Sequence, residues 1–95
     1  MDFIEFKQSL QEAHPPKQLS VFLESLWYDG KGNWKKAHDL VDDLPGTEAA
    51  RVHAYLHRVE GDESNADYWY RRAGTKRPAY TKEEEWEVLV NQFLK

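Results

Sequence analysis

Two histidines and a glutamate form the sequence pattern with the clearest capacity to bind a metal. His53, His57 and Glu60 lie at positions i, i+4 and i+7, so a helix carries all three side chains on one face. Zinc and iron sites use such imidazole and carboxylate ligands. The sequence identifies no fourth ligand, however, and the helical register turns both histidines toward a neighbouring helix. We therefore predict packed or hydrogen-bonded histidines, with metal binding as the alternative and no cofactor.

A run of three aromatic residues, Tyr68-Trp69-Tyr70, is a second candidate for function. Three consecutive helical residues fan over about 200°, so they cannot all enter one hairpin core. We predict that the additional neighbour is the last helix, through Trp86, and the alternative is a partner surface or a ligand pocket. Tyr68, Trp69 and the following Arg72 are therefore candidate binding residues. Nucleic acid is a disfavoured partner because the net charge of −4 repels a phosphate backbone.

The chain lacks the sequence signatures of common catalytic sites. No serine stands in the glycine frame of a nucleophile elbow, and no glycine-rich loop follows a strand. The carboxylates form charge runs without a recognisable pair of acid and base. A binding protein is therefore favoured over an enzyme.

Length and composition favour one small domain. The 95 residues include no cysteine, so disulfides and thiolate metal sites are excluded and the hydrophobic side chains must stabilise the fold. The first residues are acidic, unlike a basic secretion leader, and no apolar run approaches the roughly 20 residues of a membrane-spanning helix. We therefore expect a cytoplasmic protein without a membrane partner.

Apolar residues at three- and four-residue spacing, together with capping and breaking residues, predict an all-α fold. Asp2 with Glu5 and Thr81 with Glu84 are expected capping boxes. Every connection is short, and no run of residues favours a strand. Five to six short helices are expected, over about 2–13, from Pro15-Pro16 to about 28, from Asn33 to about 44, 47–60, 62–73, and 82–94.

A repeat with a period of 29 residues is the most informative feature of the sequence. The segment Gly32-Asn33-Trp34-Lys35-Lys36-Ala37 aligns with Gly61-Asp62-Glu63-Ser64-Asn65-Ala66. The alignment extends to Ser25 with Ala54, Tyr28 with His57, Val41 with Tyr70, and Leu44 with Ala73. Each unit is predicted to be a helical hairpin in which small residues allow close approach and a glycine turns the chain.

This pattern resembles the tetratricopeptide repeat family over about residues 18–80. The positions where that family has small residues, a turn glycine, an aromatic residue and a terminal proline are occupied by Ala54, Gly61, Ala66, Tyr70, Ala73 and Pro78. The chain departs from the family at Ala50 and His53, where large hydrophobic residues are preferred, and in a first unit shortened near Pro45. The segments 53–58 and 65–74 also look like a set of short bacterial proteins without an established activity.

The resemblance implies one domain, 1–95, built from two stacked antiparallel hairpins at about 18–46 and 47–80. The helices at about 2–13 and 82–94 would cap them, since two units are fewer than such arrays usually need. The family commonly binds peptides in a concave groove, which here would be lined by Phe22, Leu26, Arg51, Tyr55 and Arg58. An aromatic residue flanked by two arginines suits a peptide that bears a carboxylate. The alternative is that Arg51 and Arg58 pair with nearby acids such as Glu48 and Asp62.

The leading functional hypothesis is a small tetratricopeptide-like module for protein–protein interaction. It would bind a protein or peptide segment, or a second copy of itself as a homodimer. The competing hypothesis is a protein that binds a small molecule or a metal, or an enzyme, with a site on the face of His53, His57, Tyr55 and Arg58.

Overall fold

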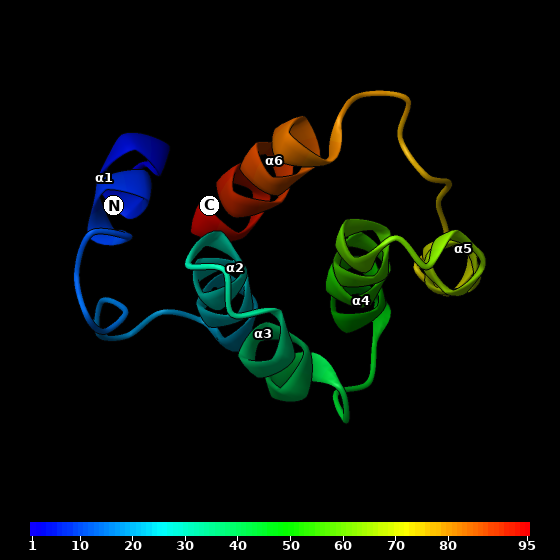
Figure 1. Cartoon of the computed structure of the whole chain (residues 1–95), viewed down its shortest axis with the longest axis horizontal. Coiled ribbons are helices and arrows are strands. Elements are labelled where there is room, and N and C mark those ends of the chain that lie inside the picture. Colours follow the sequence, from blue (N-terminus) through cyan, green and yellow to red (C-terminus); the bar gives the residue numbers. More distant parts are fainter.

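The computed structural model describes all 95 residues, and every regular element in it is an α-helix (Figure 1). The helices are α1 (Phe3–Ser9), α2 (Val21–Gly30), α3 (Trp34–Val41), α4 (Thr47–Glu60), α5 (Glu63–Arg72) and α6 (Lys82–Leu94). The prediction of an all-α fold is confirmed. None of these helices has both the length and the apolar character needed to cross a membrane.

Two helical hairpins, α2 with α3 and α4 with α5, turn in the same way. In the first hairpin the Asn33 N–H donates to the Tyr28 carbonyl at 2.9 Å. In the second, 29 residues later, the Asp62 N–H donates to the His57 carbonyl at 3.0 Å. The sequence repeat is therefore also a repeat of backbone hydrogen bonds.

Caps and small buried residues also recur between the hairpins. The side chains of Asn33 and Asp62 each accept a backbone N–H three residues later, at 3.2 and 3.3 Å, and so begin α3 and α5. The four aligned small residues are fully buried at the helix contacts: Ser25, Ala37, Ala54 and Ala66. In the first hairpin the Ser25 hydroxyl donates to the Ala37 carbonyl at 2.8 Å, which joins the two helices directly.

Gly61 ends α4 in the left-handed region, with φ at 88°, and supports a direct test of the turn. A Cβ at this position would meet no atom within 4 Å. The substitution Gly61→Ala is therefore expected to lower the free energy of unfolding by about 1–2 kcal/mol, through backbone strain alone. Urea denaturation followed by circular dichroism measures the change.

The control for this test is Gly61→Asn, because asparagine tolerates the left-handed conformation better than alanine does. We expect the asparagine variant to lose less stability. Equal losses in the two variants would contradict the assignment of the cost to the backbone.

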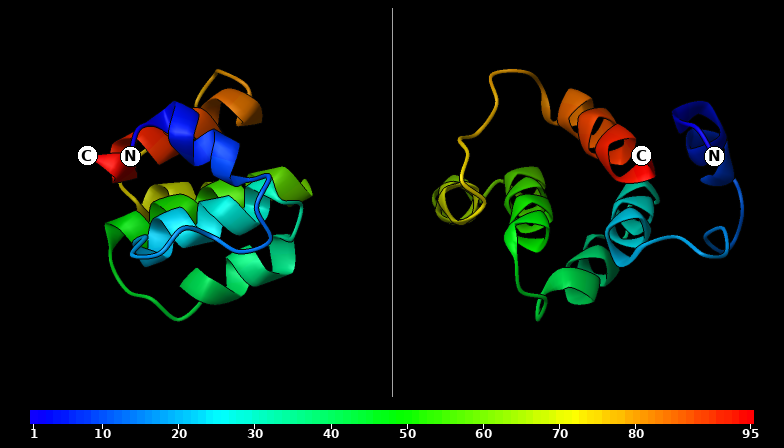
Figure 2. Two further views of the ribbon diagram at one scale, coloured as in Figure 1. Left: turned by 90° about the vertical axis from the view of Figure 1, so that its left-hand side faces the viewer. Right: turned by 180° about the vertical axis from the view of Figure 1, so that it is seen from behind.

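The last helix, α6, contacts both α2 and α4, while α3 packs against the same two helices on the opposite side and α5 lies on the far side of α4 (Figures 1 and 2). The first helix, α1, lies against α6. Residues from five helices therefore share one core, which includes Phe6, Leu26, Trp27, Val41, Leu56, Leu89 and Val90. A second, smaller cluster of Ala54, Ala66 and Tyr70 joins α4 to α5.

The N-terminal segment differs from its prediction. The first helix ends at Ser9 rather than near residue 13, because the N–H groups of residues 10–12 bond to carbonyls three residues earlier and form turns. The second helix begins at Val21 rather than at the proline pair. Gln18 has a positive φ of 68°, which interrupts any helix from Pro16, and Ser20 then provides the N-cap.

Candidate functional site

The side of α2 and α4 on which the sequence predicts a groove is occupied by α6. The Phe22 ring stacks on Phe93 of α6 with the ring centroids 5.0 Å apart. Trp86 of α6 donates its indole N–H to the Leu26 carbonyl at 2.9 Å. The predicted groove residues therefore face this chain's own last helix.

Glu85 of α6 is fully buried between the two arginines of the predicted groove. Arg58 Nη1 donates to Glu85 Oε1 at 2.9 Å, and Arg51 Nη1 donates to Oε2. The Tyr70 hydroxyl lies 2.8 and 2.7 Å from Oε1 and Oε2, and Arg58 Nη2 also donates to the Tyr80 carbonyl at 2.7 Å. The carboxylate that the arginine pair was predicted to bind is thus supplied within the chain.

The predicted partners of the two arginines and the predicted contact of the aromatic run with Trp86 are both wrong. Arg51 and Arg58 pair with Glu85 rather than with Glu48 or Asp62, because they lie seven residues apart on the face of α4 that meets α6. The additional neighbour of the aromatic run is α6, as predicted, but the contact is made by Glu85 with Tyr70.

Trp86 does not contact the aromatic run because its ring turns toward α1. Its centroid lies 5.7 Å from that of Phe3 and 5.9 Å from that of Phe6. The other two residues of the run lie elsewhere: Trp69 is half-buried against His53, with centroids 4.1 Å apart, and Tyr68 is exposed. The Arg72 guanidinium donates to the Tyr68 hydroxyl at 3.0 Å, so Tyr68 and Arg72 form an exposed surface pair.

Three histidines meet between α3 and α4, and we call His38, His53 and His57 the histidine cluster. One ring nitrogen of each lies within 4.8 Å of the others. Nε2 of His38 and Nε2 of His53 are 3.1 Å apart, and Asp42 Oδ1 lies 3.8 and 3.5 Å from these two nitrogens. The sequence pattern located two members of this cluster but missed His38 and Asp42.

Aromatic rings hold the histidine cluster in place. The Trp34 ring stacks on His38 with centroids 4.8 Å apart, and its indole N–H donates to the Leu56 carbonyl at 2.6 Å. The rings of His53 and His57 stack with centroids 5.5 Å apart. His53 is therefore confined between His57, His38 and Trp69.

Burial and the two neighbouring imidazoles lower the pKa of His53 to about 4. His53 is therefore neutral at pH 7, and its Nδ1 is buried without a hydrogen-bond partner. Glu60 Oε1 lies 2.6 Å from His57 Nδ1, so this predicted residue contacts the cluster from its outer side. Histidine binds metals as the neutral imidazole, which is the form of His53 here, and a carboxylate behind a ring, as Glu60 lies behind His57, orients that ring.

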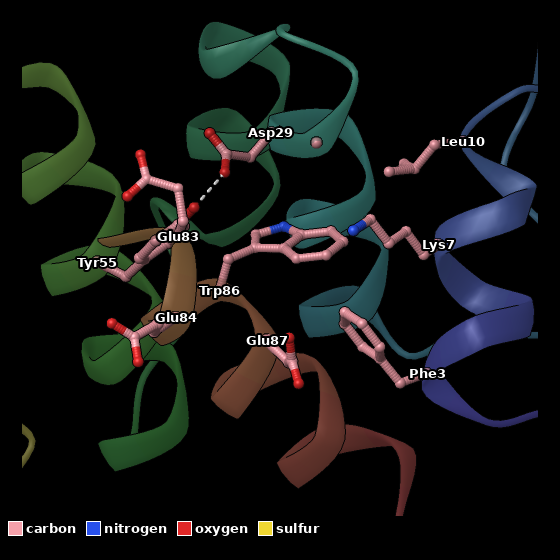
Figure 3. Close-up of a pocket in the computed structure, with 10 residues that line it drawn as sticks. Phe3, Lys7, Leu10, Asp29, Tyr55, Glu83, Glu84, Trp86 and Glu87 are labelled. Carbon is pink, nitrogen blue, oxygen red and sulfur yellow. Dashed lines mark hydrogen bonds between the residues drawn. The ribbon is translucent and has the colours of Figure 1, made fainter. Parts of the chain in front are cut away.

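A cleft with a volume of about 410 Å³ lies between α1 and the first turns of α6 (Figure 3). Its lining consists of Phe3, Lys7, Leu10, Asp29, Gly30, Tyr55, Glu83, Glu84, Trp86 and Glu87. In Figure 3 the Trp86 ring lies at the centre, with Phe3, Lys7 and Leu10 on the α1 side and Tyr55 and Asp29 on the other. We call this the α1–α6 cleft.

Tyr55 closes the inner end of the α1–α6 cleft. The residue is only 4% exposed, and its hydroxyl donates to Asp29 Oδ2 at 2.6 Å. Burial and the Asp29 carboxylate raise the pKa of Tyr55, so its hydroxyl stays protonated. Burial also raises the pKa of Asp29, while the hydrogen bond from Tyr55 acts in the opposite direction. Tyr55 thus contributes to the wall of this cleft instead of to an open groove.

Taken together, the hairpins, the filled groove and the histidine cluster define a helical-hairpin protein with two candidate binding regions. Comparison of the chain with protein-family models, with curated proteins and with solved structures gives no match. The geometry of the chain's own residues is therefore the basis for proposing a function.

Proposed function

We propose that this protein is a small helical-repeat interaction module that binds a basic peptide segment of a partner protein in the α1–α6 cleft. The observation that carries the proposal is the pairing of aromatic and acidic side chains there. Trp86 and Phe3 provide ring faces, and four carboxylates with one lysine line the same space. Lysine and arginine side chains bind such surfaces through their apolar stems and their charge.

A basic ligand in the cleft fits the structure better than the carboxylate-bearing peptide that the sequence predicts for the arginine pair. Arg51 and Arg58 are already neutralised in part by Glu85 and are largely covered, with side-chain exposures of 15 and 17%. Glu83, Glu84 and Glu87, in contrast, are exposed on the first turns of α6. The net charge of −4 also attracts a basic segment at long range.

A displayed library of random peptides, selected against the purified protein, tests this proposal. We expect the selected peptides to be enriched in lysine and arginine, and their binding to weaken as salt concentration rises. The variants Glu87→Lys and Trp86→Ala should each weaken binding of a selected peptide by roughly tenfold or more, as measured by fluorescence anisotropy.

The matched control is Asp43→Lys, which changes the net charge as Glu87→Lys does but lies at an exposed position outside the cleft. This variant should retain most of the affinity. Enrichment of acidic peptides, or equal losses in Asp43→Lys and Glu87→Lys, would count against the α1–α6 cleft as the binding site.

A further inference from the structure

We propose that the histidine cluster, with Asp42, is a binding site for one divalent transition-metal ion of the zinc type. This site is separate from the proposed peptide site. Tyr55 lines the α1–α6 cleft, and His53 and His57, each two residues from Tyr55 on α4, lie on the opposite side of that helix. Three imidazoles and one carboxylate form a ligand set that zinc accepts in tetrahedral geometry.

The distances between the candidate ligand atoms fit such an ion. Nε2 of His38, Nε2 of His53 and Oδ1 of Asp42 form a triangle with sides of 3.1, 3.5 and 3.8 Å. Ligand atoms bound to tetrahedral zinc at about 2.0–2.1 Å are separated from one another by about 3.3 Å. The triangle therefore already has nearly the size of one face of the coordination tetrahedron.

His57 is positioned to supply the fourth ligand. One of its ring nitrogens lies within 4.8 Å of the other histidine nitrogens, so a small side-chain movement completes the set. Glu60 accepts from His57 Nδ1 at 2.6 Å, so the lone pair of this ring is on Nε2, and the Asn65 amide nitrogen lies 3.5 Å from that nitrogen. A carboxylate behind a ligating histidine is the usual arrangement at zinc sites.

The surroundings favour retention of an ion and also provide a path for its entry. His53 is 2% exposed, and His38 and Asp42 both lie at the side of its Nε2, at 3.1 and 3.5 Å. The side chain of Asp42 is 54% exposed, so the site opens to solvent at that carboxylate. A bound ion would join α3 to α4 and hence the first hairpin to the second.

Titration of the metal-free protein with Co²⁺, followed by displacement with Zn²⁺, tests the site. We expect one Co²⁺ ion to bind per chain with the intense visible absorption of tetrahedral Co²⁺. Added Zn²⁺ should displace this ion and abolish the absorption. The variants His38→Gln and His57→Gln should each weaken Zn²⁺ binding by about 100-fold or more, as measured by calorimetry. Zn²⁺ should also raise the melting temperature of the wild type and leave that of these variants nearly unchanged.

The chain offers a matched control in His14→Gln, because His14 is exposed and is the one histidine outside the cluster. Its affinity for Zn²⁺ should equal that of the wild type. If circular dichroism shows that the cluster variants do not fold, the exposed-edge variant Asp42→Asn tests the site instead. We expect it to bind Zn²⁺ about 10-fold or more weakly than the wild type. Absence of Zn²⁺ binding, or equal affinity in the wild type and Asp42→Asn, would overturn the proposal.

Discussion

Replacement of Glu85 by alanine is expected to lower the free energy of unfolding by about 3–5 kcal/mol, the cost of breaking a buried ion pair on one side. The substitution leaves Arg51 and Arg58 facing each other without a counter-charge and removes the acceptor of the Tyr70 hydroxyl. A domain of this size has a total stability of about 5–15 kcal/mol, so this loss is a large fraction of the total. Urea denaturation followed by circular dichroism measures the loss.

Two further variants isolate the role of the Glu85 charge. Glu85→Gln keeps an acceptor for Tyr70 but removes the charge, and we expect a smaller loss than in Glu85→Ala. Glu87→Ala changes an exposed glutamate two residues later in the same helix, and its effect should stay within about 0.5 kcal/mol. A loss below about 1 kcal/mol in Glu85→Ala would show that this carboxylate stabilises the fold no more than a surface ion pair does.

Truncation of Trp27 to alanine is expected to lower the free energy of unfolding by about 3–5 kcal/mol. Trp27 is 1% exposed in the main core, and its indole N–H donates to the Ser9 hydroxyl at 3.1 Å, which ties α1 to α2. The variant creates a large cavity and also releases α1. Chemical denaturation measures the stability, and limited proteolysis of the first 20 residues reports the release of α1.

The comparison variants for Trp27 are Trp27→Phe and Tyr68→Ala. Trp27→Phe fills part of the cavity but cannot donate to Ser9, so it should lose less stability and still loosen α1. Tyr68 is 43% exposed, and its truncation should cost less than about 1 kcal/mol. A similar cost at Tyr68 and Trp27 would contradict the location of the core.

The helices and their repeat could be predicted because the determining signals are local. Capping pairs such as Asp2 with Glu5, and turn glycines such as Gly32 and Gly61, act within a few residues of the elements that they begin or end. The segment after α1 was mispredicted, since a proline pair permits a helix start without requiring one. There the side chain of Ser20 and the positive φ of Gln18 determine where α2 begins.

The sites were harder to predict because they depend on how helices rotate against one another. His53 and His57 share a helix, so their spacing is visible in the sequence, but His38 lies on α3, and the sequence does not specify how the connection to α4 places the two helices. Glu85 belongs to a run of three glutamates that suits the N-terminus of a helix, and only its spacing of four residues from the buried Leu89 distinguishes it from its exposed neighbours. Its partners lie 15 to 34 residues earlier in the chain.

The placement of α6 over the predicted groove has a consequence for competing ligands. The connection from Ala73 to Thr81 tethers α6 to the hairpins, so Glu85 competes for the two arginines as an intramolecular ligand. Short flexible tethers give effective concentrations of about millimolar. A free acidic peptide of equal intrinsic affinity at micromolar concentration therefore competes at a roughly thousandfold disadvantage. At such concentrations the arginine pair therefore stays bound to Glu85, and free peptides bind more readily to surfaces that α6 leaves open.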